Sequence, residues 1–333
     1  MRIIIPMAGM GKRMRPHTLT IPKPLFPIAG KPIVHRLVEE IYSVCRQEIE
    51  EIAFIIGDFG KEVEESLISI AAEVGAKGSI YYQEEALGTA HAILCAKDSL
   101  EGNVIVAFAD TLFKADFTLD KSQDGIIWVH QIEDPSAFGV VKLNEENIIT
   151  DFIEKPEEFV SDLAIIGIYY FKDGSYLKDQ LQYLIDNNIK DKGEYQITNA
   201  LENMKNQGKK LRVGSVNEWL DCGNKDATVY TNQRILEHLE KNNRKGNNIS
   251  INDSIVIQPC FIGDNVQIFN SVIGPHVSIG KSSIISNSIV KNSIIKEHSK
   301  VEELNTTNSI IGAYSQVKGE AKELSLGDYT SMF

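Results

Sequence analysis

Hydrophobic and polar positions alternate in two different ways along the chain, and the change between them predicts two domains. From the start to about residue 216, short runs rich in Ile and Val alternate with longer amphipathic segments. This alternation is typical of α/β units around a mostly parallel sheet. We expect strands at 3–7, 52–56, 79–83, 103–109, 125–131, 138–143, 148–153 and 164–171, and helices at 31–45, 60–74, 89–97 and 225–243. Because the later strands follow one another more closely, we expect a mixed sheet in the second half.

A different pattern begins after a polar, glycine-containing linker at 241–248. A polar residue followed by Ser and two Ile or Val residues recurs four times, beginning at Asp253, Asn270, Asn287 and Asn308. The first three copies are 17 residues apart and the last follows after 21. One apolar residue in about every five or six can supply an inward-facing side chain to each flat face of a triangular coil. Three such faces per turn predict a hexapeptide-type left-handed parallel β-helix. A β-sandwich of short strands is the alternative, but irregular hairpins rarely keep a fixed period.

The length of the chain agrees with this division. At 333 residues it is roughly twice a typical domain of about 150 residues. We therefore predict a Rossmann-like α/β domain over residues 1–244, followed by a short β-helix with a C-terminal tail over residues 245–333.

The charge balance restricts the partners. With 34 Lys and Arg against 46 Asp and Glu, the net charge is −12, which repels a phosphate polymer. Nucleic acid is therefore not an expected partner. A small polyanionic ligand would need a local cluster of cations or a divalent metal.

The cysteines and the hydropathy indicate the compartment. Cys45, Cys95, Cys222 and Cys260 show no C-x-x-C spacing, so we expect reduced thiols and a cytoplasmic protein. No stretch approaches the roughly 18 apolar residues of a spanning helix, and the first residues do not resemble a signal peptide. We expect no membrane anchor.

A glycine-containing loop follows the first expected strand. Its sequence is Ala8-Gly-Met-Gly-Lys-Arg13, in which two glycines allow successive N–H groups to surround a phosphate and the cations add positive charge. It is neither a Walker A loop nor a complete G-x-G-x-x-G motif, so taken alone it is weak evidence. The segment Ile21-Pro-Lys-Pro-Leu25 strengthens it, because Lys23 between two prolines is held on a rigid segment that can direct its ammonium group to the same phosphates.

The combination of these two segments with Gly30-Lys-Pro-Ile33 and a helix resembles the sugar nucleotidylyltransferases, the NDP-sugar pyrophosphorylases. The resemblance extends along nearly the whole chain. It implies a nucleotidyltransferase domain that condenses a nucleoside triphosphate with a sugar 1-phosphate and releases pyrophosphate, with Mg²⁺ as the cofactor. The loop wording looks most like the UTP–glucose-1-phosphate branch, whereas the Pro-Lys-Pro-Leu segment and the trailing β-helix look more like thymidylyl- and guanylyltransferases.

The resemblance also implies roles for individual residues. Catalytic roles would belong to Arg13, Lys23 and Lys155, and the metal would be bound by Asp110 and Asp221. The nucleotide would contact Ala8, Gly9, Gly11, Lys12, Arg13, Gln83, Gly88 and Thr89, and the sugar phosphate would contact Gly139, Glu154, Lys155 and Glu194. One of these positions has independent support, because Asp110 follows a strong strand and ligands of open α/β sheets bind at the carboxyl ends of strands.

Two positions depart from the family pattern. Lys12 stands where threonine is usual beside the arginine, and Ala109-Asp-Thr111 stands where many members have Gly-Asp-Asn. The first adds positive charge to the phosphate loop, and the second changes the flank of a metal ligand. The departure at Lys12 supports one alternative, a catalytically silent paralogue that binds nucleotide sugars.

The substrates and the role of the β-helix each leave a choice open. We expect dTTP and glucose 1-phosphate first, UTP second, and GTP with mannose 1-phosphate third. A second, acyl-transferring activity in the β-helix would need a histidine, and His276 and His298 are the histidines there. Because that helix is short, we favour an oligomerisation or regulatory role, and we expect a homo-oligomer whose size the sequence does not choose.

Overall fold

A computed structural model describes residues 1–45, 47–115, 119–240 and 245–320. It divides into two compact units. The first contains residues 1–26 and 31–224, and the second contains residues 27–30 and the chain from Lys225 onward. Each unit is described separately.

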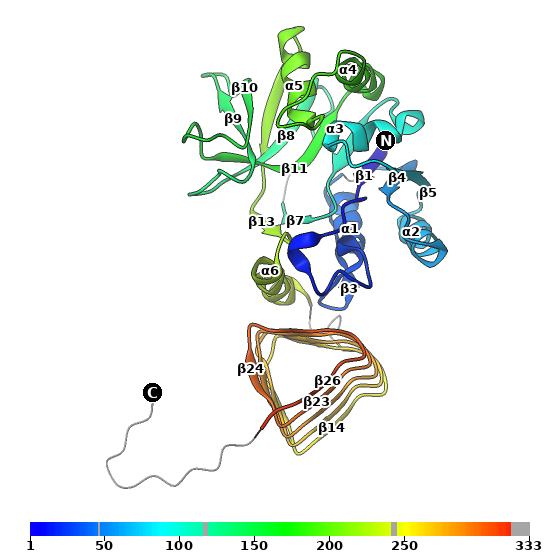
Figure 1. The fold of residues 1–333 in the computed structure, drawn as a ribbon, viewed down its shortest axis with the longest axis vertical. Coiled ribbons are helices and arrows are strands. Elements are labelled where there is room, and N and C mark those ends of the chain that lie inside the picture. Colours follow the sequence, from blue (N-terminus) through cyan, green and yellow to red (C-terminus); the bar gives the residue numbers. More distant parts are fainter. Residues whose placement is uncertain (46, 116–118, 241–244, 321–333) are drawn as a thin grey trace, which may run out of the picture. The chain divides into compact units, whose positions relative to one another are not determined.

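The first unit is built on a nine-stranded mixed sheet (Figure 1). Its central strands β1, β4, β5 and β6 pair in parallel, whereas β11 pairs antiparallel with β6, β8 and β9. This arrangement confirms the predicted α/β class and the mixed second half. The strands of this sheet are β1 (Arg2–Pro6), β4 (Glu51–Ile56), β5 (Lys77–Tyr82), β6 (Val104–Ala107), β8 (Gly125–Gln131), β9 (Gly139–Leu143), β10 (Ile149–Glu154), β11 (Leu163–Phe171) and β12 (Leu211–Ser215).

Amphipathic helices cover the sheet because their apolar stripes are buried against it. In α1 (Ile33–Cys45) the apolar stripe of Val34, Leu37, Val38, Ile41 and Cys45 is buried. The other helices of this unit are α2 (Lys61–Glu73), α3 (Thr89–Cys95), α4 (Gly174–Asp186) and α5 (Ile197–Asn206), with single 3₁₀ turns η1 (Lys12–Met14), η2 (Lys23–Leu25) and η3 (Lys97–Ser99).

A second, two-stranded sheet lies in the same unit and was not among the expected elements. Strand β7 (Thr111–Lys114) pairs antiparallel with β13 (Glu218–Asp221), and Thr111 lies opposite Asp221. Because β7 directly follows Asp110, this register brings two segments about a hundred residues apart to one place. A short strand β3 (Lys31–Pro32) precedes α1.

The second unit contains the predicted left-handed parallel β-helix. Its strands stack in parallel into three flat sheets, seen as the sides of a triangle in Figure 1. One inward side chain per strand, such as Ile268, Ile273 or Ile279, forms its core. The strands are β14 (Ser250–Asn252), β15 (Ile255–Val256), β16 (Cys260–Ile262), β17 (Gln267–Phe269), β18 (Val272–Ile273), β19 (Val277–Ile279), β20 (Ile284–Ser286), β21 (Ile289–Lys291), β22 (Ile294–Ile295), β23 (Lys300–Glu302), β24 (Asn305–Thr307), β25 (Ile310–Ile311) and β26 (Gln316–Lys318).

The structure explains the irregular spacing of the fourth repeat. The polar residues Asp253, Asn270 and Asn287 occupy one corner of successive coils, and all have positive φ. Asn308 lies at another corner, where its side chain accepts a hydrogen bond of 2.6 Å from Asn292. The fourth copy is therefore not the next member of the column, and the strand after it, β25, belongs to a different sheet from β15, β18 and β21.

Helix α6 (Lys225–His238) and the short strand β2 (Pro27–Ile28) belong to the second unit. Buried Asn232 of α6 accepts hydrogen bonds from the Ala29 backbone at 2.9 Å and from the Ser278 hydroxyl at 2.7 Å. The compact units thus separate at residue 224, and the border predicted at residue 245 stays a prediction. Residues 241–244 of the predicted linker and residues 321–333 of the predicted tail lie outside the described residues. In the part that is described, no helix combines the length and apolar character needed to cross a bilayer.

Candidate functional site

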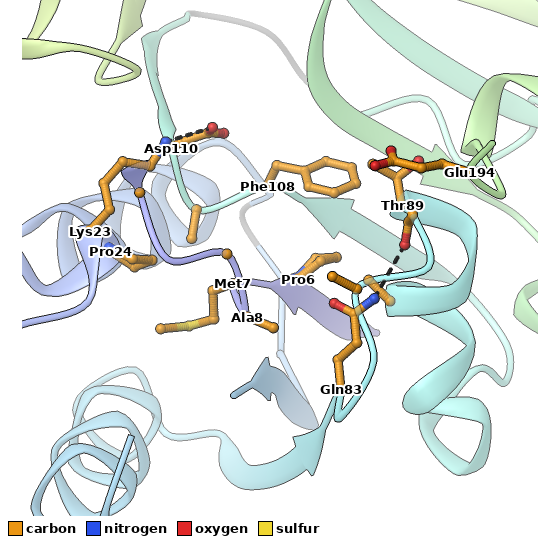
Figure 2. Close-up of a pocket in the computed structure, with 16 residues that line it drawn as sticks. Pro6, Met7, Ala8, Lys23, Pro24, Gln83, Thr89, Phe108, Asp110 and Glu194 are labelled. Carbon is orange, nitrogen blue, oxygen red and sulfur yellow. Dashed lines mark hydrogen bonds and ion pairs between the residues drawn. The ribbon is translucent and has the colours of Figure 1, made fainter. Parts of the chain in front are cut away.

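Two adjoining cavities of the first unit contain most of the predicted site residues. The first has a volume of about 270 Å³ and lies at the carboxyl ends of β1 and β6 (Figure 2). Its lining includes Ala8, Gly9, Gly11, Lys23, Gln83, Gly88, Thr89, Phe108, Asp110 and Glu194. This is the edge of the sheet where open α/β folds bind ligands.

The second cavity has a volume of about 530 Å³ and shares Thr89, Phe108 and Asp110 with the first. Its lining includes Arg13, Phe138, Gly139, Glu154, Lys155, Tyr169, Trp219 and Asp221. Asp110 therefore stands where the two cavities meet.

The glycine loop is shaped by contact with the Pro-Lys-Pro segment. Gly11 has φ of +58°, and a Cβ added there would lie 2.7 Å from Cβ of Lys23. The Thr18 hydroxyl donates to the Gly11 carbonyl at 2.8 Å. Only glycine fits this left-handed position beside Lys23, so the sequence at Gly11 and the position of Lys23 depend on each other.

Lys23 and Asp110 form an ion pair at the centre of the site. Nζ of Lys23 lies 2.7 Å from Oδ2 of Asp110, and Figure 2 shows the two side chains meeting. Lys23 is 8% exposed, which is rare for a lysine and requires a partner for its charge.

Asp221 reaches the same place from β13. The amide of the next residue, Cys222, donates a hydrogen bond of 3.0 Å to the Asp110 carbonyl. Burial raises the pKa of the Asp221 carboxyl, a hydrogen bond from the Gly223 backbone lowers it, and the charge of Asp110 raises it further. The two carboxylates therefore repel each other, and bringing a cation to them would relieve that repulsion.

Glycine at position 223 is required by the same arrangement. A Cβ there would lie 2.9 Å from Oδ2 of Asp221 and 3.1 Å from Nη2 of Arg13. The absence of a side chain lets both charged groups lie over the backbone, where the charge of Arg13 also lowers the pKa of Asp221.

The donor chemistry of this pair suits magnesium. Asp110 and Asp221 offer hard oxygen ligands, and Mg²⁺ is typically held by one or two carboxylates together with substrate phosphates. No cluster of three or more His, Cys, Asp or Glu side chains that could hold a metal occurs in the described part of the chain. A metal bound here would thus depend on the substrate for further ligands.

The segment around Gly88 is held by contacts with Tyr195 and the start of α5. Tyr195 donates its amide to the Leu87 carbonyl, and its own carbonyl accepts from Ala90, each at 2.8 Å. Gly88 has φ of +114°, and a Cβ there would meet the Tyr195 backbone at 2.5 Å. The Thr89 hydroxyl adds a hydrogen bond to Gln196 and accepts one from the Ile197 amide. This predicted nucleotide-binding segment is therefore rigidly placed at the cavity.

The predicted sugar-phosphate residues gather along the second cavity. Gly139 packs so closely that a Cβ would lie 3.1 Å from Oε2 of Glu154. Lys155 has φ of +42°, its amide donates to the Phe138 carbonyl at 3.1 Å, and its Nζ lies 3.5 Å from Oε1 of Glu154. A lysine kept in the left-handed region is strained, and such strain concentrates at functional sites.

Three predicted residues do not line the cavity in which most of their predicted binding group lies. Lys12 is exposed and lines neither cavity, Arg13 lines the second cavity rather than the first, and Glu194 lines the first rather than the second. Their predicted roles, like those of the other site residues, stay predictions.

Aromatic residues of the second cavity were not assigned a role from the sequence. The rings of Phe138 and Trp219 meet edge to face with centroids 4.8 Å apart, and Tyr169 is buried in the same lining. Phe138 directly precedes Gly139, and Trp219 lies two residues before Asp221, so their nearness in sequence to predicted site residues was a signal that could have identified them. Such rings provide an apolar wall for the C–H groups of a ligand.

Comparisons with known proteins identify the family of the chain. The sequence model of a family described as Nucleotidyl transferase matches residues 2–238. The chain is 31% identical over 262 residues to a protein of Methanococcus maripaludis named Bifunctional protein GlmU, covering 78% of this chain and 60% of that protein. It is 27% identical to a glucose-1-phosphate thymidylyltransferase of Streptomyces antibioticus, covering 100% of this chain and 99% of that protein.

A solved structure is similar as well. A crystal structure of UDP-glucose pyrophosphorylase complexed with UDP-glucose matches with a TM-score of 0.58 and 25% identity. The match covers 72% of this chain and 99% of the pyrophosphorylase. The similarity thus includes nearly the whole of that protein and leaves part of this chain unmatched.

Proposed function

The chain belongs to the nucleotidyl transferase family, and from this premise we propose that it joins a nucleoside triphosphate to a sugar 1-phosphate and releases pyrophosphate. The observation that carries the proposal is the position of Asp110 between two cavities, each lined by a cation. One cavity would hold the nucleotide and the other the sugar phosphate, so that the reacting groups meet at Asp110.

In the reaction, an oxygen of the sugar phosphate forms a bond to the α-phosphorus as the bond from that phosphorus to the bridging oxygen of pyrophosphate breaks. Both substrates are polyanions, so the protein must position them and compensate their charge. No covalent bond to the protein is needed.

The charged residues divide this work. Arg13 would stabilise the leaving pyrophosphate, and Lys23 and Lys155 would steer the attacking phosphate. Asp110 and Asp221 would hold Mg²⁺, which when bound neutralises charge on the α-phosphate.

For the substrates we propose dTTP and glucose 1-phosphate. The support is the thymidylyltransferase relative, which matches over the full length of the chain. UTP with glucose 1-phosphate is the next candidate, since the similar crystal structure contains UDP-glucose. GTP with mannose 1-phosphate is the third. A panel of these nucleotides against glucose, mannose and N-acetylglucosamine 1-phosphates, read as pyrophosphate release, distinguishes them.

The direct test of the function is Asp110→Asn. We expect pyrophosphate release to fall by at least about a hundredfold, the scale of one lost electrostatic contact in an active site. Asp98→Asn, an exposed aspartate of η3, is the matched control and should leave the rate unchanged. A near-normal rate of Asp110→Asn would reject the metal role, and a wild-type protein inactive with every nucleotide and sugar phosphate would favour the silent paralogue.

For the β-helix we propose a role in assembly of a homo-oligomer or in regulation. Its histidines have structural contacts: His276 lies 2.9 Å from Glu237, and His298 stacks on Tyr314 with ring centroids 4.8 Å apart. Acetyl-CoA consumption with any sugar phosphate would instead support an acyl-transferring function.

A further inference from the structure

The side chain of Gln83 is anchored at both hydrogens of its amide nitrogen. Nε2 lies 3.3 Å from the Gly88 carbonyl oxygen and 3.2 Å from Nδ1 of His91. Both partners belong to the start of α3, and Gln83 follows β5. The amide therefore bridges the end of a strand and the first turn of a helix.

The Gly88 carbonyl determines which end of the amide faces it. A carbonyl oxygen can only accept, so the group beside it must be the NH₂ of Gln83. That carbonyl is itself held by the first hydrogen bond of α3, from the Ala92 amide at 3.0 Å. The segment around Gly88 is held as well, because the Tyr195 amide donates to the Leu87 carbonyl and the Tyr195 carbonyl accepts from the Ala90 amide, each at 2.8 Å.

The orientation has two consequences. First, Nδ1 of His91 must accept the second N–H of Gln83, so this imidazole carries its proton on Nε2. Second, Oε1 of Gln83 is directed away from both anchors. Within the described ranges no group donates to Oε1, and Figure 2 shows it on the side of the amide that faces Ala8.

We propose that His91 is a positioning residue for base recognition, which keeps Oε1 of Gln83 turned into the nucleotide cavity as a hydrogen-bond acceptor. An acceptor there selects a base that presents an N–H at the centre of its Watson–Crick edge, as thymine, uracil and guanine do. Cytosine and adenine present an unprotonated ring nitrogen at that point and would leave two acceptors facing each other. This inference rests on the proposed function, since it assigns the first cavity to the nucleotide.

The test compares three variants of His91. Leucine removes the acceptor, asparagine offers Oδ1 near the position of Nδ1, and lysine offers only donors. For each variant, kcat/KM is measured with UTP, dTTP, GTP, CTP and ATP at a fixed concentration of the sugar phosphate, and melting temperatures show whether the variant is folded.

We expect the wild-type protein to prefer its best nucleotide over CTP by at least about a hundredfold, because an unmatched buried polar group is strongly rejected. His91→Leu should lower kcat/KM for the best nucleotide by about tenfold and reduce the preference over CTP, with KM for the sugar phosphate unchanged. For His91→Asn, kcat/KM with the best nucleotide should lie within about threefold of the wild-type value, whereas for His91→Lys it should not.

An unchanged preference over CTP in His91→Leu would overturn the proposal, as would an equal loss with every nucleotide or a failure of asparagine to restore the preference. Titration calorimetry with UTP and CTP gives the same comparison without turnover. A protein that prefers UTP in binding but releases no pyrophosphate would refute the proposed function while leaving the role of His91 intact.

Discussion

The ammonium group of Lys23 lies 2.7 Å from a carboxylate oxygen of Asp110, although 87 positions separate the two residues. One comes from the segment behind the glycine loop and the other from the end of β6, so the pair connects two of the chain segments that line the first cavity. Removing one member of a buried pair leaves the other charge uncompensated, which is costly. The pair is therefore a structural contact that also holds in place the cation proposed for the substrate phosphate.

Replacing Lys23 by methionine should lower kcat/KM for pyrophosphate release by at least about a hundredfold, because methionine keeps much of the length but not the charge. Lys97→Met is the matched control, since Lys97 is an exposed residue of η3 that lines neither cavity, and its rate should stay within about threefold of wild type. Equal losses in the two variants would contradict the special position of Lys23.

The glycine loop gives a second prediction through its contact with the same lysine. Alanine at position 11 would place a methyl group 2.7 Å from Cβ of Lys23 and require positive φ of a residue that rarely adopts it. We expect Gly11→Ala to destabilise the first unit by about 1–3 kcal/mol and to lower activity at least about tenfold.

The neighbouring glycine is the control for that experiment. A Cβ added at Gly9 meets no atom within 4 Å, and its φ is not in the left-handed region. Gly9→Ala should therefore keep the wild-type unfolding midpoint in urea. If both variants unfolded at the same lower midpoint, the steric argument for Gly11 would be wrong.

Much of the fold was predictable because its signals are local. The apolar run at 125–131 gave the bounds of β8 as they are observed, and the stripe of α1 was readable from its period. Helix α4 was not among the expected elements, although Asp173 caps it by accepting from the Tyr176 amide, and Leu177, Leu181 and Leu184 form its buried stripe. A capping residue and a helical period are both local signals, so this helix could have been predicted.

The sequence supplied candidate residues for the site but not their contacts. The family resemblance named Asp110 and Asp221 as candidates, yet their approach depends on the pairing of β7 with β13 and on the hydrogen bond from Cys222. The edge-to-face contact of Phe138 with Trp219 likewise joins segments that are far apart in the sequence. Sheet pairing between distant segments is decided by the whole fold, so no local pattern contains it.

A charged cluster formed by α1 and the preceding β3 predicts how stability depends on pH. Glu39 accepts hydrogen bonds from His35 and Lys31, and these contacts lower the pKa of its carboxyl from 4.5 to about 2, with His35 the larger cause. The folded chain thus favours the carboxylate, so the stabilisation is complete above pH 4.5 and is lost as the pH falls toward 2. The side chain is partly exposed, which makes the effect modest.

We therefore expect Glu39→Gln to melt below wild type at pH 6 and the difference in melting temperature to shrink steadily between about pH 4.5 and pH 2. Glu65→Gln is the matched control, because Glu65 is an exposed glutamate of α2 with no ion pair to any described residue. Its melting temperature should follow that of wild type at each pH. The contrary result is a difference in melting temperature between wild type and Glu39→Gln that stays constant down to about pH 2. A proton would then bind Glu39 equally well in the folded and unfolded chains. The contacts with His35 and Lys31 would therefore not favour the ionised form of Glu39.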